Sequence, residues 1–386
     1  MILFVSLFGG GAYSNGRPST IYKRVANKKL FITSDFSHTE KLYRNIRNPH
    51  DDEVSVHVPS YSKNIGISRL WSHLVFAYRL RKILHSMKLK PSAIYCAMPS
   101  SSSAYVCARY CKNHQIKFII DVIDLWPDSL LPLAKGKAIV NILLYPWKYI
   151  TRYAYKSADV ILGESVAYAN EAKKCNSNAE VYPIYLGVDV DTVNKVKENL
   201  SIHLDKPQDE IWIAYAGSFK ASNDLLALLS AIKELHGKVK YKLWLVGDGV
   251  ERPFLEKYIY DNKLDAEITG FCRYQDLLSY LYYCDIAINI FKKGTKVVFS
   301  YKFNDYVAMN CFVLNSLEGE TAEMVDSYHI GRNFDFDSHP LSEVLKDTIL
   351  HWDIYSSWKK NSDRLVEEKL DKEKIYSVVD HVFSCG

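Results

Sequence analysis

Three glycine turns in the second half of the chain each follow an apolar stretch and precede a helical pattern. They lie at Gly217, at Gly247-Asp248-Gly249 and at Gly270. A turn of this kind aims backbone N–H groups and the positive end of a helix dipole at an anion, so it suits a phosphate group. One strand–glycine–helix turn alone is common in Rossmann-like domains and identifies no ligand.

The turns belong to an ordered series of motifs. The series comprises Tyr215–Lys220, Lys242–Arg252, Ile268–Arg273, Cys284–Phe291 and Ser300–Met309, preceded by Asp121–Asp128, Ser157–Leu162 and Tyr185–Asp189. In this order the first five motifs resemble the donor domain of glycosyltransferase family 4, and the three that precede them resemble other motifs of the same family. Asp121–Asp128 resembles the DxxDLWP run of the members that assemble bacterial polysaccharides and lipid-linked glycans. The resemblance covers most of residues 90–330.

The resemblance implies an α/β protein of the GT-B type, with two Rossmann-like doubly wound domains facing a cleft. It implies transfer of a sugar, with retention of anomeric configuration, from a nucleotide sugar (a UDP-sugar is favoured) to a glycan or lipid-linked acceptor. Such proteins need no bound metal and no cofactor, and serve the synthesis of surface polysaccharides such as lipopolysaccharide or capsule.

The resemblance also assigns roles to particular residues. Lys220 and Lys302 would stabilise the leaving diphosphate, where negative charge develops. Asp305 would accept hydrogen bonds from the ribose hydroxyls. Asp124 would lie in the cleft, and we group it with the two lysines as a catalytic candidate. The remaining donor-site candidates are Gly217, Ser218, Gly247, Gly249, Phe271, Arg273, Ser300 and Tyr301.

The sequence departs from the family pattern at three positions. Val297 stands where the family has an acidic residue near the donor sugar, and Ile123 stands where many members have a histidine. Asn310-Cys311-Phe312 replaces a Gly-x-Pro turn, which asparagine tolerates because it adopts left-handed backbone readily. A non-catalytic protein that binds a nucleotide sugar is therefore one alternative. A nucleotide-sugar 2-epimerase is another, although no histidine lies near the glycine turns.

Each candidate also has a structural explanation. Lys220, Lys302 and Asp305 are of types that are usually solvated at the surface. Gly247 and Gly249 suit a turn with positive φ and no ligand. Asp124 and Trp126 together suit a loop anchor.

Apolar β-branched runs alternate with helical patterns along the chain, which predicts parallel α/β layers. We expect an acceptor domain over residues 1–190, a donor domain over 191–370 and a terminal helix over 371–386 that packs back on the first domain. The first strand, Ile2–Leu7, leads into a loop in which Gly10, Gly11 and Arg17 are acceptor-side candidates. Helices are expected at Ser68–Met87 and Ala138–Lys156, among others.

Charge divides the 386 residues unevenly. Residues 1–190 hold 25 Lys and Arg against 13 Asp and Glu, whereas the remainder holds 24 against 31. Basic, aromatic stretches at 70–84 and 135–156 predict contact with an anionic membrane face, although a buried helix with a solvated basic side explains either stretch alone. No nucleic-acid motif occurs.

The eight cysteines lack metal spacing, so we predict no metal site and a reducing, cytoplasmic location. The N-terminal stretch lacks the pattern of a signal peptide.

Overall fold

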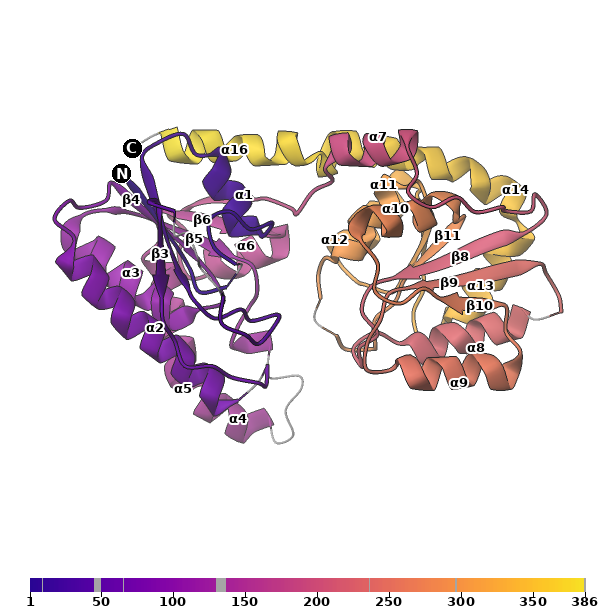
Figure 1. Cartoon of the computed structure of the whole chain (residues 1–386), viewed down its shortest axis with the longest axis horizontal. Helices are drawn as coiled ribbons and strands as arrows, with labels where there is room; N and C mark the ends of the chain where they lie inside the picture. Colours follow the sequence, from indigo (N-terminus) through magenta and orange to yellow (C-terminus); the bar gives the residue numbers. More distant parts are fainter. Residues whose placement is uncertain are drawn as a thin grey trace. The chain divides into compact units, whose positions relative to one another are not determined.

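The computed structural model describes residues 1–8, 10–44, 50–64, 66–129, 137–235, 237–295 and 297–384. The chain forms two compact units (Figure 1). The N-terminal unit comprises Met1–Tyr185 and the residues from Tyr376 onward, and the C-terminal unit comprises Leu186–Ile375. The sequence placed the first boundary at residue 190 and the second at residue 370, within a few residues of these positions.

The N-terminal unit is built on a seven-stranded parallel sheet with the order β3-β2-β1-β4-β5-β6-β7. Its strands are β1 (Ile2–Ser6), β2 (Lys29–Ser34), β3 (Glu53–Val56), β4 (Ala93–Ala97), β5 (Lys117–Val122), β6 (Val160–Gly163) and β7 (Glu180–Pro183). Every residue of β1 and β4 is buried, which explains their continuous apolar sequences.

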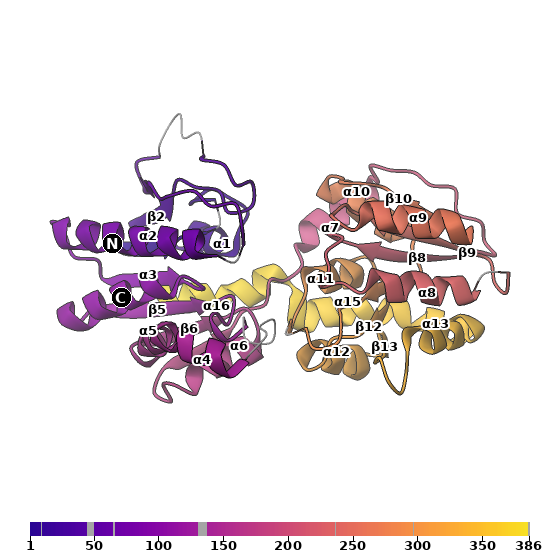
Figure 2. The ribbon, with the colours of Figure 1, turned by 90° about the horizontal axis from the view of Figure 1, so that it is seen from below.

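Helices cover both faces of this sheet (Figure 2). They are α1 (Arg17–Arg24), α2 (Ile67–Ser86), α3 (Ser101–His114), α4 (Lys137–Leu143), α5 (Tyr145–Lys156), α6 (Val166–Lys173) and the C-terminal part of α16 (Lys372–Ser384). α2, α3 and α5 pack side by side on one face. α16 lies on the other face, where the ring of Phe383 stacks on Phe4 at 5.5 Å.

The C-terminal unit is built on a six-stranded parallel sheet with the order β10-β9-β8-β11-β12-β13. Its strands are β8 (Ile211–Ala216), β9 (Tyr241–Val246), β10 (Ala266–Ile268), β11 (Ile286–Asn289), β12 (Phe312–Asn315) and β13 (Gly331–Asn333).

The helices of this unit lie on both sides of the sheet, with α8 and α9 on one side and α10 and α11 on the other (Figure 1). They are α7 (Val190–Glu198), α8 (Leu225–Leu235), α9 (Arg252–Asn262), α10 (Tyr274–Tyr283), α11 (Tyr301–Ala308), α12 (Glu320–Tyr328), α13 (Leu341–Leu350), α14 (Trp352–Tyr355) and α15 (Asn361–Leu365). Short 3₁₀ and π turns at Ser356–Lys360 and Val366–Leu370 flank α15.

The predicted α/β class and the pair of doubly wound sheets are confirmed, and several local predictions are wrong. The expected single helix over 138–156 is two helices, α4 and α5. The first two residues of the basic stretch 135–156 lie outside the described residues. Arg17, expected in a loop, begins helix α1. β7 and β13 are additional edge strands that the apolar pattern did not reveal.

The described cysteines are free, and those expected to be buried, Cys96, Cys284 and Cys311, are buried. Within the described ranges, no helix combines the length and apolar character that crossing a bilayer requires.

Candidate functional site

The second sheet reverses its strand order between β8 and β11, and the predicted donor residues gather around the ends of these two strands. Ligands of open α/β sheets bind outside the carboxyl ends of the strands at such a switch point. β8 ends at Ala216, immediately before Gly217, and β11 ends at Asn289. α11 begins at Tyr301 and carries Lys302 back to these ends.

The Lys302 ammonium lies among polar and aromatic partners. Its Nζ donates to Tyr215 Oη and to Asn223 Oδ1, both at 3.3 Å. It also lies 4.2 Å from the centre of the Phe291 ring. Among the described residues, no carboxylate forms an ion pair with it. Burial and, secondarily, repulsion by Lys220 lower the pKa of Lys302 to about 7, so an anion bound here would restore its charge.

A ladder of three asparagines, of which Asn289 and Asn315 are fully buried and Asn333 is half-buried, holds the start of α11 in place. Asn289, Asn315 and Asn333 stand in register at the ends of β11, β12 and β13. The Asn289 amide donates to Asn315 Oδ1, and the Asn315 amide donates to Asn333 Oδ1, both at 2.8 Å. Ser300 Oγ donates to Asn289 Oδ1 at 3.0 Å and accepts from the Phe303 N–H, which caps α11. The ladder therefore fixes Ser300 and the helix that carries Lys302.

The glycines at the carboxyl ends of β8 and β9 allow two loops to touch. Gly247 has φ +149°, and a Cβ there would lie 2.0 Å from the carbonyl oxygen of Gly217. A Cβ on Gly249 would lie 2.4 Å from the carbonyl oxygen of Phe219, and one on Gly217 would lie 3.0 Å from Lys302 Cδ. Backbone contact therefore accounts for Gly247 and Gly249, and Gly217 leaves room for the Lys302 side chain.

Asp305 lies one turn further along α11 and faces α10. Its Oδ1 accepts a hydrogen bond from Tyr274 Oη at 2.8 Å. Burial raises the pKa of Asp305 to about 7, against the opposing effect of this hydrogen bond. A half-buried carboxylate with one neutral donor retains acceptor capacity for hydroxyl groups. Asp305 was predicted from the sequence as a donor-site residue, and its contact with Tyr274 was not.

The remaining donor candidates are mostly at the surface. Phe271 is 91% exposed. Arg273 forms two hydrogen bonds with Asp276, both at 2.9 Å, and these lower the pKa of Asp276 to about 2. Ser218, Lys220 and Tyr301 have exposed side chains, and Val297 is half-buried. Tyr215 and Phe291, which contact Lys302, lie in the motifs Tyr215–Lys220 and Cys284–Phe291 but were not predicted as site residues. Asn223 had no distinguishing signal in the sequence.

In the N-terminal unit, Arg17 forms a buried ion pair. It does not lie in the acceptor-side loop where the sequence placed it. Its guanidinium binds Asp121 with N–O distances of 2.9–3.1 Å, and both side chains are at most 2% exposed. Tyr95 Oη adds a hydrogen bond to Asp121 Oδ2 at 2.5 Å. Arg17 therefore ties α1 to β5.

Gly10 and Gly11 form a turn with positive φ that packs against a second ion pair. The Gly10 carbonyl accepts from Arg44 at 2.6 Å, and a Cβ on Gly11 would lie 2.6 Å from both Arg44 and Glu53. Glu53 also accepts the Ala12 N–H at 2.8 Å. The turn is thus anchored to the neighbouring segments of the same unit.

Asp124 and Glu164 follow β5 and β6, at the carboxyl edge of the first sheet. Burial raises the pKa of Asp124. Glu164 is 8% exposed, and its Oε2 has no hydrogen-bond partner among the described residues. Burial raises the pKa of Glu164 to about 7, although Arg17 opposes the shift. Sequence reasoning missed Glu164.

Replacing Glu164 with glutamine is expected to stabilise the protein at alkaline pH. Because the folded pKa lies above the ordinary value of 4.5, the native state gains protons relative to the unfolded state and loses stability as pH rises from about 4.5 to 7. We expect Glu164→Gln to increase the free energy of unfolding by about 2 kcal/mol at pH 8 and to change little at pH 4. Urea denaturation measures both values. The exposed Glu180→Gln serves as control, and equal effects of the two variants would contradict the prediction.

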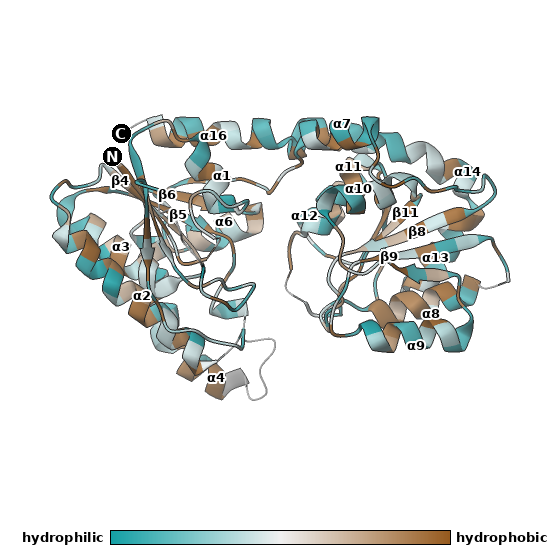
Figure 3. Cartoon of the chain, viewed as in Figure 1, coloured by the Kyte–Doolittle hydropathy of each residue, from teal (hydrophilic) through white to brown (hydrophobic). Residues whose placement is uncertain are grey.

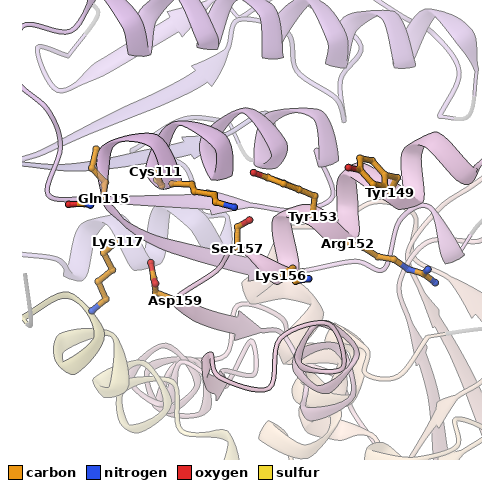
Figure 4. A pocket seen from close by; sticks show the side chains of 11 residues that line it. Cys111, Gln115, Lys117, Tyr149, Arg152, Tyr153, Lys156, Ser157 and Asp159 are labelled. Carbon is orange, nitrogen blue, oxygen red and sulfur yellow. The ribbon is translucent and has the colours of Figure 1, made fainter.

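A surface cavity of about 1020 Å³ lies at the opposite edge of the first sheet (Figure 4). α3, α5 and the amino ends of β5 and β6 form its walls. Four cationic side chains line it, from Lys112, Lys117, Arg152 and Lys156, with Tyr149 and Tyr153. The position favours an accessory surface, since ligands of such sheets bind at the carboxyl edge.

The described residues contain no cluster of three or more His, Cys, Asp or Glu suited to a metal ion. Comparison with family models and with curated protein sequences gives no match.

Solved structures match along the whole chain. Sucrose-phosphate synthase from Thermosynechococcus elongatus has a TM-score of 0.72 at 14% identity, with 99% of this chain and 98% of that chain covered. Anabaena HepE in complex with UDP has a TM-score of 0.69 at 14% identity, with 99% of each chain covered. WaaG, a glycosyltransferase of lipopolysaccharide biosynthesis, has a TM-score of 0.65 at 11% identity, with 100% of each chain covered. These likenesses show that the chain has the GT-B fold, with two Rossmann-like parallel-sheet domains.

Proposed function

We propose that the protein is a glycosyltransferase that moves a sugar from a nucleotide diphosphate sugar, with UDP favoured, to a glycan or lipid-linked saccharide. The observation that carries the proposal is Lys302, a half-buried ammonium at the switch point of the second sheet that has no carboxylate partner among the described residues. HepE, which shares the fold at low identity, is known in complexes with UDP and with UDP-glucose. That parallel supports the choice of donor.

In this proposal, each part of the donor site has a separate task. Lys302 and the first N–H groups of α11 contact the diphosphate, and Lys220 supplies a second cation from the adjacent loop. Asp305 accepts hydrogen bonds from the ribose hydroxyls, in addition to the one from Tyr274. The exposed ring of Phe271 suits stacking with the base. We further propose a retaining, family 4-like reaction in which the leaving phosphate assists, so that no metal and no enzymic nucleophile takes part.

The arrangement around Lys302 and Asp305 favours the transferase over the epimerase, because no histidine lies among the described contacts of either side chain. A binding protein without turnover would keep the same diphosphate contacts. Formation of a glycosylated product from a UDP-sugar distinguishes the transferase from such a binding protein.

The first test is equilibrium binding of UDP, GDP and CMP, with their sugars, measured by thermal shift. A ligand that binds only the folded state raises the melting temperature. We expect one nucleotide, UDP, to stabilise the protein and Asp305→Asn to weaken that effect, while the surface variant Asp326→Asn retains it. Folded protein that shows no shift with any nucleotide at millimolar concentration would refute the proposal.

We also propose that the N-terminal unit contacts an anionic membrane, where a lipid-linked acceptor is found on the cytoplasmic face. Helices α2, α3, α4 and α5 contain no acidic residue. Large apolar side chains are exposed on α2, including Trp71 at 57%, Leu74 and Tyr78, and further ones on α4 and α5. Figure 3 shows hydrophobic residues, in brown, along α2 and α4. The basic cavity between α3 and α5 adds the charge that anionic headgroups require. Phe76, counted as part of this face from the sequence, is instead buried in the core.

Vesicle co-sedimentation tests this contact. We expect binding to vesicles that contain phosphatidylglycerol, weaker binding in high salt, and a loss of at least several-fold in Arg152→Gln/Lys156→Gln. Vesicles of phosphatidylcholine alone are the control. Equal binding by the variant and the wild-type protein would argue against the surface.

A further inference from the structure

Arg69, the third residue of α2, carries a buried charge at the carboxyl edge of the first sheet. It is 5% exposed, and its guanidinium lies 4.0 Å from the Trp126 ring centre and 5.2 Å from the Phe8 ring centre. NH1 donates to the Asn64 carbonyl. Phe8 follows β1 and Trp126 follows β5, so aromatic residues from two strand ends enclose the planar group.

The charge of Arg69 lacks an ion-pair partner among the described residues, and its Nε has no hydrogen-bond partner. His73, one turn further along α2, is 3% exposed, and its Nε2 also has no hydrogen-bond partner among the described residues. Burial lowers the pKa of Arg69, and the opposing influences of Tyr61 and Asp124 are smaller. Asp124 forms no ion pair with Arg69 in the described part of the chain. Buried polar groups without partners are rare and costly, and a buried guanidinium without a counter-ion is more so.

Apart from Asp124, the described polar side chains near Arg69 are cationic or neutral. His38 forms a hydrogen bond with Tyr61 at 2.7 Å, and Lys41 Nζ lies 3.4 Å from His38 Nδ1. Burial and, secondarily, the charge of Arg69 lower the pKa of His38 to about 4 and that of His73 to about 3. Both imidazoles are therefore neutral hydrogen-bond partners, and the excess charge here is positive.

This cluster lies where the strand order of the first sheet reverses, between β1 and β4. The same position in the second sheet holds Lys302. Ligands of open α/β sheets bind at this point, and Arg is suited to phosphate and carboxylate because its planar fork donates two parallel hydrogen bonds. Stacking on Trp126 fixes the plane of that fork.

We propose that Arg69 and His73 bind an anionic group, a phosphate or a carboxylate, on the saccharide acceptor. This assignment rests on the proposed glycosyltransferase function, because it names the acceptor class of the same enzyme. It requires an acceptor sugar that bears a phosphate or a uronic acid carboxylate, in contrast to a neutral sugar.

Titration calorimetry on the full chain saturated with UDP tests the site, since the donor position is then occupied. The probes are inorganic phosphate, glucuronate and uncharged glucose. We expect the wild-type protein to bind phosphate or glucuronate in preference to glucose, and Arg69→Met to weaken that binding at least about tenfold. Arg69→Lys keeps the charge without the fork and is expected to be intermediate. Arg81→Met, an exposed arginine on the same helix, is the matched control.

A thermal melt shows whether each variant is folded. Removing an uncompensated buried charge does not destabilise a protein as breaking an ion pair does, so Arg69→Met is expected to melt no lower than wild type. His73→Gln is a second variant, and it replaces one neutral side chain with another. Equal anion binding by wild type, Arg69→Met and His73→Gln overturns the assignment, as does preference for glucose. UDP could fail to bind while anion binding still depends on Arg69. That result would contradict the proposed donor and would still support the anion site.

Discussion

Lys302→Met is expected to lower the rate of sugar transfer by 10²–10³-fold, roughly the loss that follows removal of one group that stabilises developing charge. The Lys302 side chain contacts Tyr215, Asn223 and Phe291. Among the described residues, no carboxylate pairs with its charge. Methionine keeps most of the apolar stem but cannot contact a diphosphate. Single-turnover transfer from the UDP-sugar that binds most tightly measures the effect.

The exposed Lys233→Met on α8 is the control for this experiment and is expected to retain the wild-type rate. The Lys302→Met protein should keep its melting temperature, because the substitution leaves no counter-ion unpaired among the described residues. A rate within threefold of wild type would show that groups other than Lys302 stabilise the diphosphate.

The same side chain predicts a pH dependence of UDP binding. In the free protein the pKa of Lys302 is about 7, and a bound diphosphate raises it. Binding then takes up a proton between the two values, so UDP affinity falls as pH rises above about 7. Calorimetry at pH 8 in buffers of different ionisation enthalpy detects the uptake, and Lys302→Met should abolish it.

Asp121→Asn is expected to destabilise the N-terminal unit by about 3–5 kcal/mol, because it leaves the Arg17 guanidinium buried without its counter-ion. This is a large part of the stability of an ordinary domain. Hydrogen exchange of peptides from β1 and β5 measures the loss in this unit independently of the C-terminal unit, and protection should fall by about two to four orders of magnitude.

The control is an Arg–Asp pair of similar geometry at the surface. Arg24 contacts Asp380 at 3.0–3.1 Å, and the Asp380 side chain is 55% exposed. Asp380→Asn should cost less than about 1 kcal/mol, because water screens such pairs. If the two variants lost similar protection, burial would not be the reason for the effect.

The sequence was sufficient to predict the class of fold because long apolar strands alternate with helices. It was sufficient to place Lys302 on a helix because a helical pattern runs from Tyr301 to Met309. It failed at β13, whose residues Gly331, Arg332 and Asn333 show no apolar run. It also failed at α1, although Pro18 at the helix start is a usual signal.

The contacts of the site were beyond sequence reasoning for a different reason. Arg17 and Asp121 are separated by 104 positions, and Tyr274 and Asp305 by 31. Periodicity reports which face of an element is buried, but it does not report which distant polar group meets another there. Arg69 and Glu164 were missed because single charged residues in the sequence are most often solvated.

The asparagine ladder has a use in recognising related chains. An asparagine that ends an otherwise apolar, fully buried strand has amide atoms that require a partner, and the neighbouring parallel strand at the same level is where that partner must be. Ile286–Asn289 and Phe312–Asn315 each end in this way, and the Asn315 amide finds acceptors in the Leu317 carbonyl and in Asn333 Oδ1 on the next strand. Paired strand-terminal asparagines in a related sequence therefore indicate that two such strands are neighbours in the sheet.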